Sequence, residues 1–276
     1  ITHIKTTGAQ TGNVFLAYKN VKEIDDLVAK WTTEKNPQYD FTADDLVQHS
    51  IWIVNDDKVI EAITKYFKEL VPHSYIADGH HRAASAAKVR KELGIHATEN
   101  ADIFLTTLFP SNQLAIMDYN RLVKDLNGLT SAEFLQKLEE KFSIEKKDKA
   151  YRPEALHDFG FYLDNQWYKL SSKAGTYTED PIGILDITIL QEQVLEPLLG
   201  IKDQRTDKRI DFVGGIRGLE ELEKRVNSGE MKLAVSLHPV SIEQLFNIAD
   251  SGNVMPPKST WFEPKLRDGL LTHLID

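Results

Sequence analysis

The residues best suited to chemistry lie in one run, Asp78-Gly79-His80-His81-Arg82. An apolar segment precedes this run and an alanine-rich segment follows it, so we expect a strand that ends here and a helix that begins here. The free N–H groups in the first turn of a helix attract anions. Arg82 can add two parallel hydrogen bonds to a phosphate. The run therefore predicts a site for a phosphate or a carboxylate.

The side chains of this run are expected to have separate roles. Arg82 and a histidine would donate hydrogen bonds to a phosphate, and Gly79 would let the backbone turn and the ligand approach closely. Asp78 could bind a metal ion or accept a proton, which makes it a catalytic candidate together with His80 and His81. Because adjacent helical residues do not share a face, we expect the two histidines to point in different directions. In the alternative interpretation, Asp78 only caps the helix and the histidines are surface residues.

A second candidate segment, residues 204–215, is a charged loop that contains Arg209 and ends in the glycine pair Gly214 and Gly215. The pair could surround a phosphate, with Arg209 as a further phosphate contact, although the segment matches neither the P-loop nor the dinucleotide-binding pattern. A tight turn beside a solvated charge cluster explains the segment equally well.

A third candidate segment, residues 255–265, holds three prolines, two lysines, two hydroxyl residues and two aromatic residues. Rigid loops of this composition often form ligand pockets. We expect Trp261 and Phe262 to pack in the core. The residues expected to contact a ligand are Lys258, Ser259 and Lys265.

The composition restricts the class of partner. The chain has 276 residues, no cysteine and a formal net charge of −9. Without cysteine there are no disulfides or thiolate nucleophiles, which fits a reducing cytoplasm. The acidic charge argues against DNA as a partner, and no apolar run reaches the roughly 20 residues that span a bilayer. We expect a cytoplasmic protein that binds a nucleotide and a small-molecule substrate.

Strands and helices alternate along the chain, but turns join several of the strands. This order favours a mixed α/β fold, with helices packed on a mixed sheet, over a doubly wound fold. The chain would form one large domain or two tightly packed lobes, residues 1–130 and 131–276. The expected strands are 14–18, 51–54, 75–77, 103–109, 114–117, 159–163, 166–170 and 232–237.

Local signals predict where helices and turns begin. Capping boxes begin at Thr130 and Ser241, and residues 164–165 read as a hairpin turn. Asp186 is expected to cap a helix over residues 187–199. Further helices are expected at residues 21–31, after Asp56 or Asp57, at 80–93 and at 219–226.

The chain resembles the domain-of-unknown-function 1015 family. Members of that family are longer at the N-terminus, so the resemblance implies that Ile1 lies inside the family domain and that its N-terminal third is missing here. The resemblance rests on four ordered motifs: residues 75–82, 118–121, 207–215 and 255–265.

The run at residues 78–82 also resembles the nucleotide-contacting motif of the ParB/sulfiredoxin superfamily, in which a Gly-x-x-Arg turn begins a helix and binds phosphates. This resemblance implies a ParB/sulfiredoxin-like core. Sulfiredoxin activity is excluded, because it needs a cysteine within the motif and the chain has none. ParB-type proteins bind CTP and DNA, and they have an arginine-rich version of the motif and a separate DNA-binding helix-turn-helix. Neither feature is evident here. The run is more similar to that of free-serine kinases.

The likeness to free-serine kinases implies a phosphotransferase that uses ATP or ADP with Mg²⁺ and acts on a small hydroxylated metabolite such as free serine. In that scheme residues 79–82 surround the phosphates, Asp78 binds Mg²⁺ or activates the hydroxyl, and Lys258 and Lys265 close over the anionic substrate. Two alternatives remain open. One is a ParB-like nucleotide-binding regulator without catalysis, and the other is a metal-dependent hydrolase that uses Asp78, His80 and His81.

Overall fold

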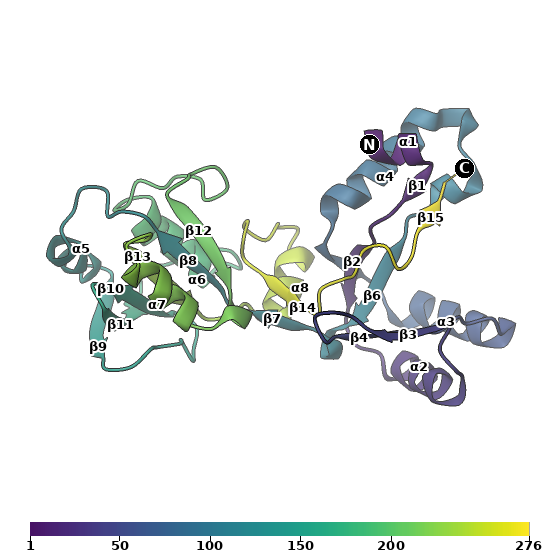
Figure 1. Ribbon diagram of the computed structural model, residues 1–276, viewed down its shortest axis with the longest axis horizontal. Coiled ribbons are helices and arrows are strands. Elements are labelled where there is room, and N and C mark those ends of the chain that lie inside the picture. The colour runs from purple at the N-terminus through teal and green to yellow at the C-terminus, as the bar shows by residue number, and fades with distance from the viewer. Residues whose placement is uncertain (276) are drawn as a thin grey trace. The chain divides into compact units, whose positions relative to one another are not determined.

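The computed structural model describes residues 1–275 and forms two compact units. The first unit comprises Ile1–Leu114 and the C-terminal segment that starts at Lys265, and the second comprises Ala115–Pro264. The lobe boundary expected at residue 130 does not coincide with these unit boundaries. Both units combine helices with sheets (Figure 1), so the predicted mixed α/β class is confirmed.

The first unit is built on a three-stranded sheet in the order β5-β2-β6. The central strand β2 (Val14–Tyr18) is buried throughout, which explains its continuous apolar sequence. It runs antiparallel to β5 (Ser74–Asp78) and parallel to β6 (Thr106–Pro110). Since β2 and β5 are antiparallel, the residues before β2 lie beside the end of β5.

Four helices accompany this sheet: α1 (Thr2–Thr7), α2 (Lys22–Glu34), α3 (Asp57–Leu70) and α4 (His80–Leu93). As expected, Asp56 caps α3 by accepting hydrogen bonds from the backbone N–H groups of Lys58 and Val59. The strand predicted at residues 51–54 is wrong. Only Ile51 is extended, as the end of β4 (Gln48–Ile51), which pairs with β3 (Tyr39–Thr42). The residues after Ile51 have no partner strand and lead into α3.

The C-terminal segment completes the first unit. Its strand β15 (His273–Leu274) pairs with β1 (Ala9–Gln10). Ile275 is buried against Val89 of α4 and Ala101. The two ends of the described chain therefore meet in one unit (Figure 1).

The second unit contains a six-stranded antiparallel sheet in the order β12-β8-β13-β10-β11-β9. Side chains alternate between its two faces, as the period of two in a strand requires. On β10, Phe161 belongs to the larger apolar core and its neighbour Tyr162 to the smaller one on the opposite face. The strands are β8 (Tyr119–Val123), β9 (Phe142–Lys147), β10 (Asp158–Leu163), β11 (Gln166–Ser172), β12 (Ile210–Gly214) and β13 (Leu233–Leu237).

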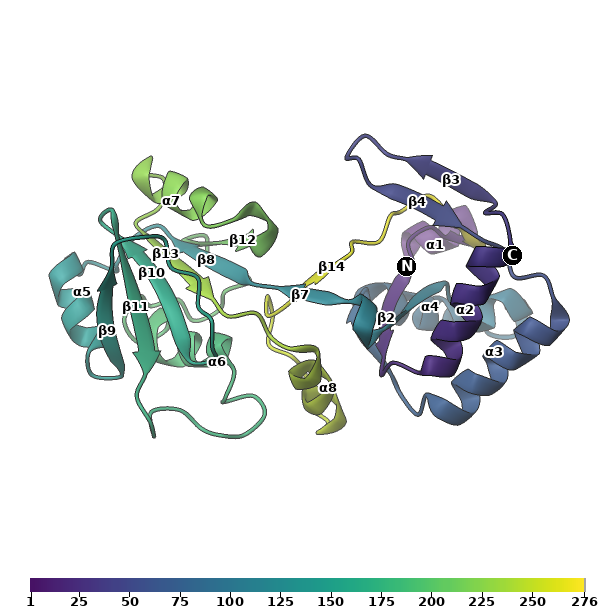
Figure 2. The ribbon, with the colours of Figure 1, turned by 90° about the horizontal axis from the view of Figure 1, so that it is seen from below.

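Helices cover both faces of this sheet (Figure 2). Leu222 and Val226 of α7 (Glu220–Asn227) pack on the smaller core, and Leu190 of α6 (Asp186–Leu190) on the larger. The unit also contains α5 (Ser131–Leu138), α8 (Ile242–Asp250) and the paired strands β7 (Ala115–Met117) and β14 (Trp261–Glu263). The capping boxes predicted at Thr130 and Ser241 are confirmed, as is the hairpin turn at residues 164–165.

The prediction that Asp186 caps a helix is wrong. Leu185 occupies the cap position, and Asp186 is the first helical residue. Its side chain is buried, with one oxygen accepting a hydrogen bond from the backbone N–H of His157 at 2.8 Å. The predicted long helix also changes character, because α6 continues as a π-helix, Gln191–Leu195, before the chain turns at Gly200. The Asp186 side chain thus binds the backbone of His157, which is distant in sequence, instead of capping the helix.

Candidate functional site

The predicted strand–glycine–helix corner is present in the first unit. Strand β5 ends at Asp78, and Gly79 takes a left-handed conformation with φ of 90° before α4 begins at His80. Asp78 Oδ1 accepts a hydrogen bond from the backbone N–H of Gly79 at 2.8 Å. No described side chain caps α4. Asp78 therefore does not act as a cap for the first turn, and the N–H groups there remain available to a ligand.

Arg82 folds back over this corner. A Cβ atom on Gly79 would lie 2.8 Å from both Nε and Nη2 of Arg82, so only glycine leaves room for the guanidinium. Nη2 lies 3.6 Å from Asp78 Oδ2. The Nε atom is buried and has no hydrogen-bond partner among the described residues. Arg82 thus has an unused donor, although 40% of its side chain is exposed.

The two histidines lie together, which corrects the expectation that they point in different directions. The ring centroids of His80 and His81 are 4.2 Å apart, with an angle of 46° between the planes. In the first turn of a helix no preceding turn restricts the side-chain rotamers, so two neighbouring rings can converge. Both side chains are exposed. They are placed to donate hydrogen bonds at the same end of α4.

A pocket of about 670 Å³ lies beside Arg82. The loop before β2 forms part of its wall, because antiparallel pairing brings that loop next to the end of β5. A Cβ atom on Gly12 would lie 3.3 Å from Arg82 Cδ and 3.2 Å from Asp268 Oδ1. The residues that line the pocket are Ile1, His3, Ile4, Gln10, Thr11, Gly12, Val14, His81, Arg82, Ser85, Asp268, Gly269 and Thr272.

Sequence reasoning missed Gly12 and Asp268. The small residues of Thr11-Gly12-Asn13, directly before a buried strand, were an available signal for the first. No local signal points to Asp268, since its place in the pocket depends on the pairing of β15 with β1.

In the second unit, residues from the three other sequence motifs meet in one aromatic cluster, formed by Tyr119, Phe212 and Trp261. The ring of Tyr119 lies 5.5 Å from that of Phe212 and 5.4 Å from that of Trp261, between centroids. A Cβ atom on Gly214 would lie 2.8 Å from the ring of Trp261. Close packing against the indole therefore explains this glycine. The expected core position of Phe262 is confirmed, because its side chain is 3% exposed.

A fully buried arginine, Arg121, supports the cluster. Its guanidinium donates hydrogen bonds to the backbone oxygens of Tyr119 and Lys258 and to the side-chain oxygen of Gln204, and lies 5.2 Å from the ring centroid of Phe212. Burial lowers the pKa of Arg121 to about 9, so the group is still charged at neutral pH.

Lys258 is held in an unusual conformation next to this arginine. Its φ is 60°, a region that residues other than glycine rarely adopt, and its backbone oxygen accepts the hydrogen bond from Arg121 at 2.8 Å. Its ammonium lies 5.3 Å from the ring centroid of Phe212 and forms no ion pair with another described residue. Lys258 is exposed, so its charge faces solvent at the edge of the cluster.

Gly215 is required by Asp118. The backbone N–H of Gly215 donates to the backbone oxygen of Asp118 at 2.7 Å. A Cβ atom on Gly215 would overlap the Asp118 carboxylate, which is buried and accepts a hydrogen bond from Asn120 at 2.6 Å. The glycine pair thus has a packing explanation. Phosphate binding by Gly214 and Gly215 stays a prediction.

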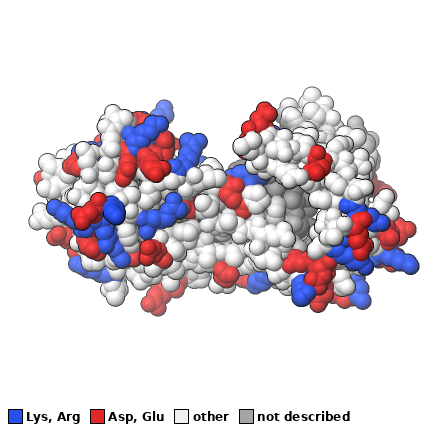
Figure 3. All heavy atoms as spheres, turned by 60° about the horizontal axis from the view of Figure 1, so that its bottom comes forward, with Lys and Arg blue, Asp and Glu red and all other residues white. Residues whose placement is uncertain are grey.

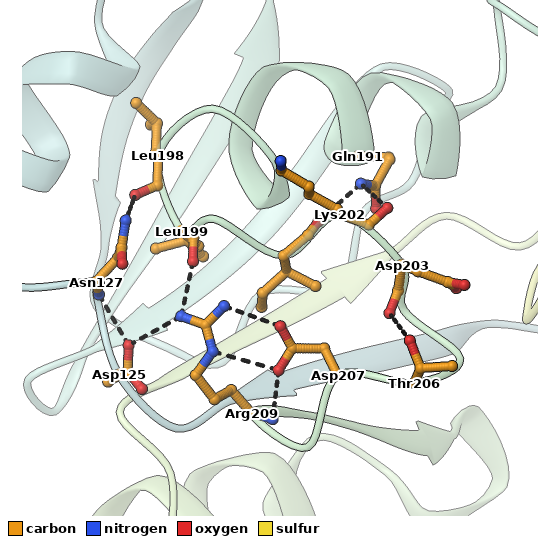
Figure 4. A network of polar contacts seen from close by, with 11 residues as sticks. Asp125, Asn127, Gln191, Leu198, Leu199, Lys202, Asp203, Thr206, Asp207 and Arg209 are labelled. Carbon is orange, nitrogen blue, oxygen red and sulfur yellow. Dashed lines mark hydrogen bonds and ion pairs between the residues drawn. The ribbon is translucent and has the colours of Figure 1, made fainter.

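The guanidinium of Arg209 already has several partners (Figure 4). It donates to Asp207 Oδ2 and to the backbone oxygen of Leu199, both at 2.9 Å, and lies 3.6 Å from Asp125 Oδ1. These contacts tie the loop before β12 to neighbouring segments. Hydrogen bonds from Arg209 lower the pKa of Asp207.

The remaining candidates have different environments. Ser259 is buried, and its hydroxyl donates to the backbone oxygen of Pro256. Lys265 is exposed at the start of the C-terminal segment of the first unit. Phosphate contacts by Arg209, Lys258, Ser259 and Lys265 stay predictions.

Three properties of the described residues bear on the class of ligand or partner: the distribution of surface charge, the grouping of metal-ligand side chains and the hydropathy of the helices. On the face in Figure 3, acidic and basic side chains are interspersed and form no broad basic field. Residues 1–275 contain no cluster of three or more histidine and acidic side chains that could hold a metal ion. Within the same range, no helix is both long and apolar enough to cross a membrane.

Comparisons with known proteins place these observations in context. A family model described as "Protein of unknown function (DUF1015)" matches residues 1–188. A search among curated proteins gives no match. Similar solved structures include a free serine kinase in complex with AMP, with 13% identity, a TM-score of 0.41 and coverage of 92% of this chain and 89% of that chain. A conserved hypothetical protein from Pyrococcus furiosus has 14% identity, a TM-score of 0.42 and coverage of 94% of both chains.

Proposed function

We propose a function on the premise that this chain belongs to the family of proteins of unknown function DUF1015, whose model covers residues 1–188. The resemblance to this family is thereby confirmed. The matched residues contain the motifs at 75–82 and 118–121, whereas those at 207–215 and 255–265 lie beyond them. The proposed function is a nucleotide-dependent phosphotransferase that acts on a small hydroxylated metabolite such as free serine.

The arrangement around Arg82 is the observation that carries the proposal. An uncapped helix end, an arginine with an unused Nε donor and a pocket of about 670 Å³ occur together in the first unit. Phosphoryl transfer requires electrostatic stabilisation of phosphate oxygens and in-line positioning more than covalent chemistry. The N–H groups of α4, Arg82 and the paired histidines supply donors for those oxygens.

The reaction assigns a definite role to Asp78. The substrate hydroxyl oxygen attacks the terminal phosphorus, the bond between that phosphorus and the bridging oxygen breaks, and the nucleoside phosphate leaves. The hydroxyl proton passes to the Asp78 carboxylate, which is 65% exposed and lies at the same corner as Arg82. General-base catalysis requires the carboxylate to lie within hydrogen-bond reach of the hydroxyl. In this proposal the substrate hydroxyl therefore lies at the corner itself, next to the pocket that Arg82 lines.

The residues at this corner fit Mg²⁺ only when the nucleotide contributes ligands. Mg²⁺ in phosphate sites is held by one or two carboxylates, phosphate oxygens and water. Asp78 is the carboxylate at the corner itself. Because its Oδ1 already accepts the N–H of Gly79, Oδ2 could hold the ion or accept the hydroxyl proton, but not both at once. Bound in this way, the ion would neutralise charge on the phosphates.

The test combines binding with turnover. Purified protein is titrated calorimetrically with ADP, with and without Mg²⁺, and then incubated with ATP or ADP and serine to detect phosphoserine. Arg82→Gln should weaken ADP binding about 10- to 100-fold, the value of one or two hydrogen bonds to a charged group. Arg90→Gln is the matched control, because Arg90 lies on the same helix with a similar exposure of 38% and pairs with Asp102. Its ADP affinity should stay within about twofold.

The outcomes separate the hypotheses. Absence of ADP binding to the unmodified protein contradicts the proposal. Binding without a phosphorylated product, across a panel of hydroxylated metabolites, supports a nucleotide-binding regulator instead. Asp78→Asn should abolish turnover and retain ADP binding if Asp78 accepts the proton.

A further inference from the structure

The pocket beside Arg82 has walls of opposite charge. Arg82, at the start of α4, contributes a cationic group, and Asp268 of the C-terminal segment contributes an acidic group. Asp268 is exposed and forms no hydrogen bond or ion pair with another described residue. Arg82 and Asp268 both approach the same point above Gly12, yet they do not pair with each other. Asp268 therefore keeps its charge available for a ligand. Arg82, whose Nη2 lies 3.6 Å from Asp78, keeps its Nε donor available.

Contacts on both sides of Asp268 fix its position. The neighbouring Arg267 lies 3.3 Å from Asp45 Oδ2. Further along, β15 pairs with β1, and the backbone N–H of Ile275 donates to the backbone oxygen of Gly8 at 2.8 Å. The hydroxyl of Thr98 donates to the backbone oxygen of Ile275 at 2.6 Å. Asp268 thus belongs to a segment anchored at two places and is held at the pocket.

A simple anion does not match this charge distribution. A free phosphate on Arg82 would gain nothing from Asp268, since two negative charges repel. A ligand that matches has an anionic end for Arg82 and neighbouring hydroxyl donors for a carboxylate. A ribose diol provides two adjacent hydroxyls, and an ionised carboxylate accepts hydrogen bonds on both oxygens. The pocket volume lies in the range of sites for ligands of this size.

We propose that Asp268 binds the ribose hydroxyls of a nucleotide whose phosphates lie at Arg82. This inference rests on the proposed function, because it takes a nucleotide as the ligand. In this proposal the C-terminal segment gives the pocket its selectivity for a ribonucleotide over other phosphate compounds. Asp268 acts in binding and takes no part in phosphoryl transfer.

The experiment compares three ligands by titration calorimetry: ADP, 2′,3′-dideoxy-ADP and pyrophosphate. Asp268→Asn should weaken ADP binding about 10-fold or more, as expected when hydrogen bonds to a charged acceptor are lost. The same variant should bind dideoxy-ADP and pyrophosphate at least as tightly as the unmodified protein does, because a negative charge near the phosphates is removed. Asp44→Asn, which changes an exposed acid between β3 and β4 of the same unit, is the control and should bind all three ligands normally.

Each result has one meaning. Normal ADP affinity of Asp268→Asn overturns the assignment of Asp268 and leaves the proposed nucleotide site intact. Equal weakening for ADP and dideoxy-ADP also overturns it, because the effect then arises without the diol. Absence of both ADP and pyrophosphate binding to the unmodified protein overturns the proposed function, and this inference with it.

Discussion

The two glycine corners of this protein, at Gly79 and at Gly215, look alike in sequence but serve different physical needs. Gly79 lies between a strand and a helix, and Gly215 directly follows a strand as the first residue of a short helical turn. Gly79 is required for a positive φ and for the guanidinium that folds over it, whereas Gly215 is required because a carboxylate fills the space where a Cβ would be. The first corner borders a pocket, and the second is packed. A glycine before a helix therefore indicates a binding site only when the space beside it is open.

The arginines near the two corners differ in the same way. Arg121 is fully buried and donates to three acceptors from one guanidinium. Arg82 is partly exposed and keeps Nε unpartnered. Since a buried donor without a partner is destabilising, the unused donor of Arg82 is consistent with a ligand, and the satisfied donors of Arg121 are consistent with a structural role.

The largest expected effect follows from filling the packed corner. Gly215→Ala should lower the free energy of unfolding by about 4 kcal/mol, because the new methyl group overlaps a buried carboxylate. Urea denaturation measures this loss. Gly229→Ala, in open space with φ of 79°, is the control and should cost only about 1 kcal/mol. Asp118→Ala in the Gly215→Ala background should recover part of the loss, and strict additivity would contradict the overlap.

A smaller effect is expected from pH. Burial raises the pKa of Asp186 to about 7, while in the unfolded chain it titrates near 3.9. The folded state then binds more protons between these values, so this residue stabilises the fold at pH 4 and loses that contribution as the pH rises through about 7. Between pH 5 and pH 8 the loss is about 3 kcal/mol. Unfolding free energies at pH 5 and pH 8 should differ less in Asp186→Asn than in the unmodified protein.

The smallest expected change in stability is at the open corner. Gly79→Ala places alanine in the left-handed region at the start of α4 and should cost about 1 kcal/mol. Gly94→Ala, at φ of 55° and ψ of −124° at the end of the same helix, should cost more, on the order of 2 kcal/mol. Only Gly79→Ala should weaken ADP binding, because its methyl group displaces the Arg82 guanidinium. An equal effect of both variants on ADP affinity would remove the distinction between the corners.

Local patterns predicted the parts of the fold that depend on near neighbours in sequence. The capping boxes at Thr130 and Ser241, the turn at residues 164–165 and helix α4 were all recognisable because their hydrogen bonds join residues a few positions apart. The strand expected at 51–54 failed because strand formation depends on a partner elsewhere in the chain. Asp186 failed for a related reason, since His157 is distant in sequence.

The candidate site was predictable only on one side. Asp78, Gly79 and Arg82 are contiguous, so their chemistry could be recognised from the order of residues alone. Gly12 and Asp268 come to the same pocket through sheet pairing over long separations. The convergence of the His80 and His81 rings depends on rotamers that the sequence does not specify.

The antiparallel pair formed by β7 and β14 has a consequence for folding. Ala115 and Glu263 are direct partners in this pair. They lie at the beginning and the end of the second unit, so the folded unit keeps its two connections to the first unit close together in space. If the second unit unfolds, it becomes a long flexible loop between the two parts of the first unit. Closing such a loop costs a few kcal/mol in entropy, because the cost grows with the logarithm of the loop length. The penalty would weaken the docking of the C-terminal segment, which contains β15 and Asp268, on the rest of the first unit. The folded second unit thereby acts as a short tether for the segment that completes the pocket.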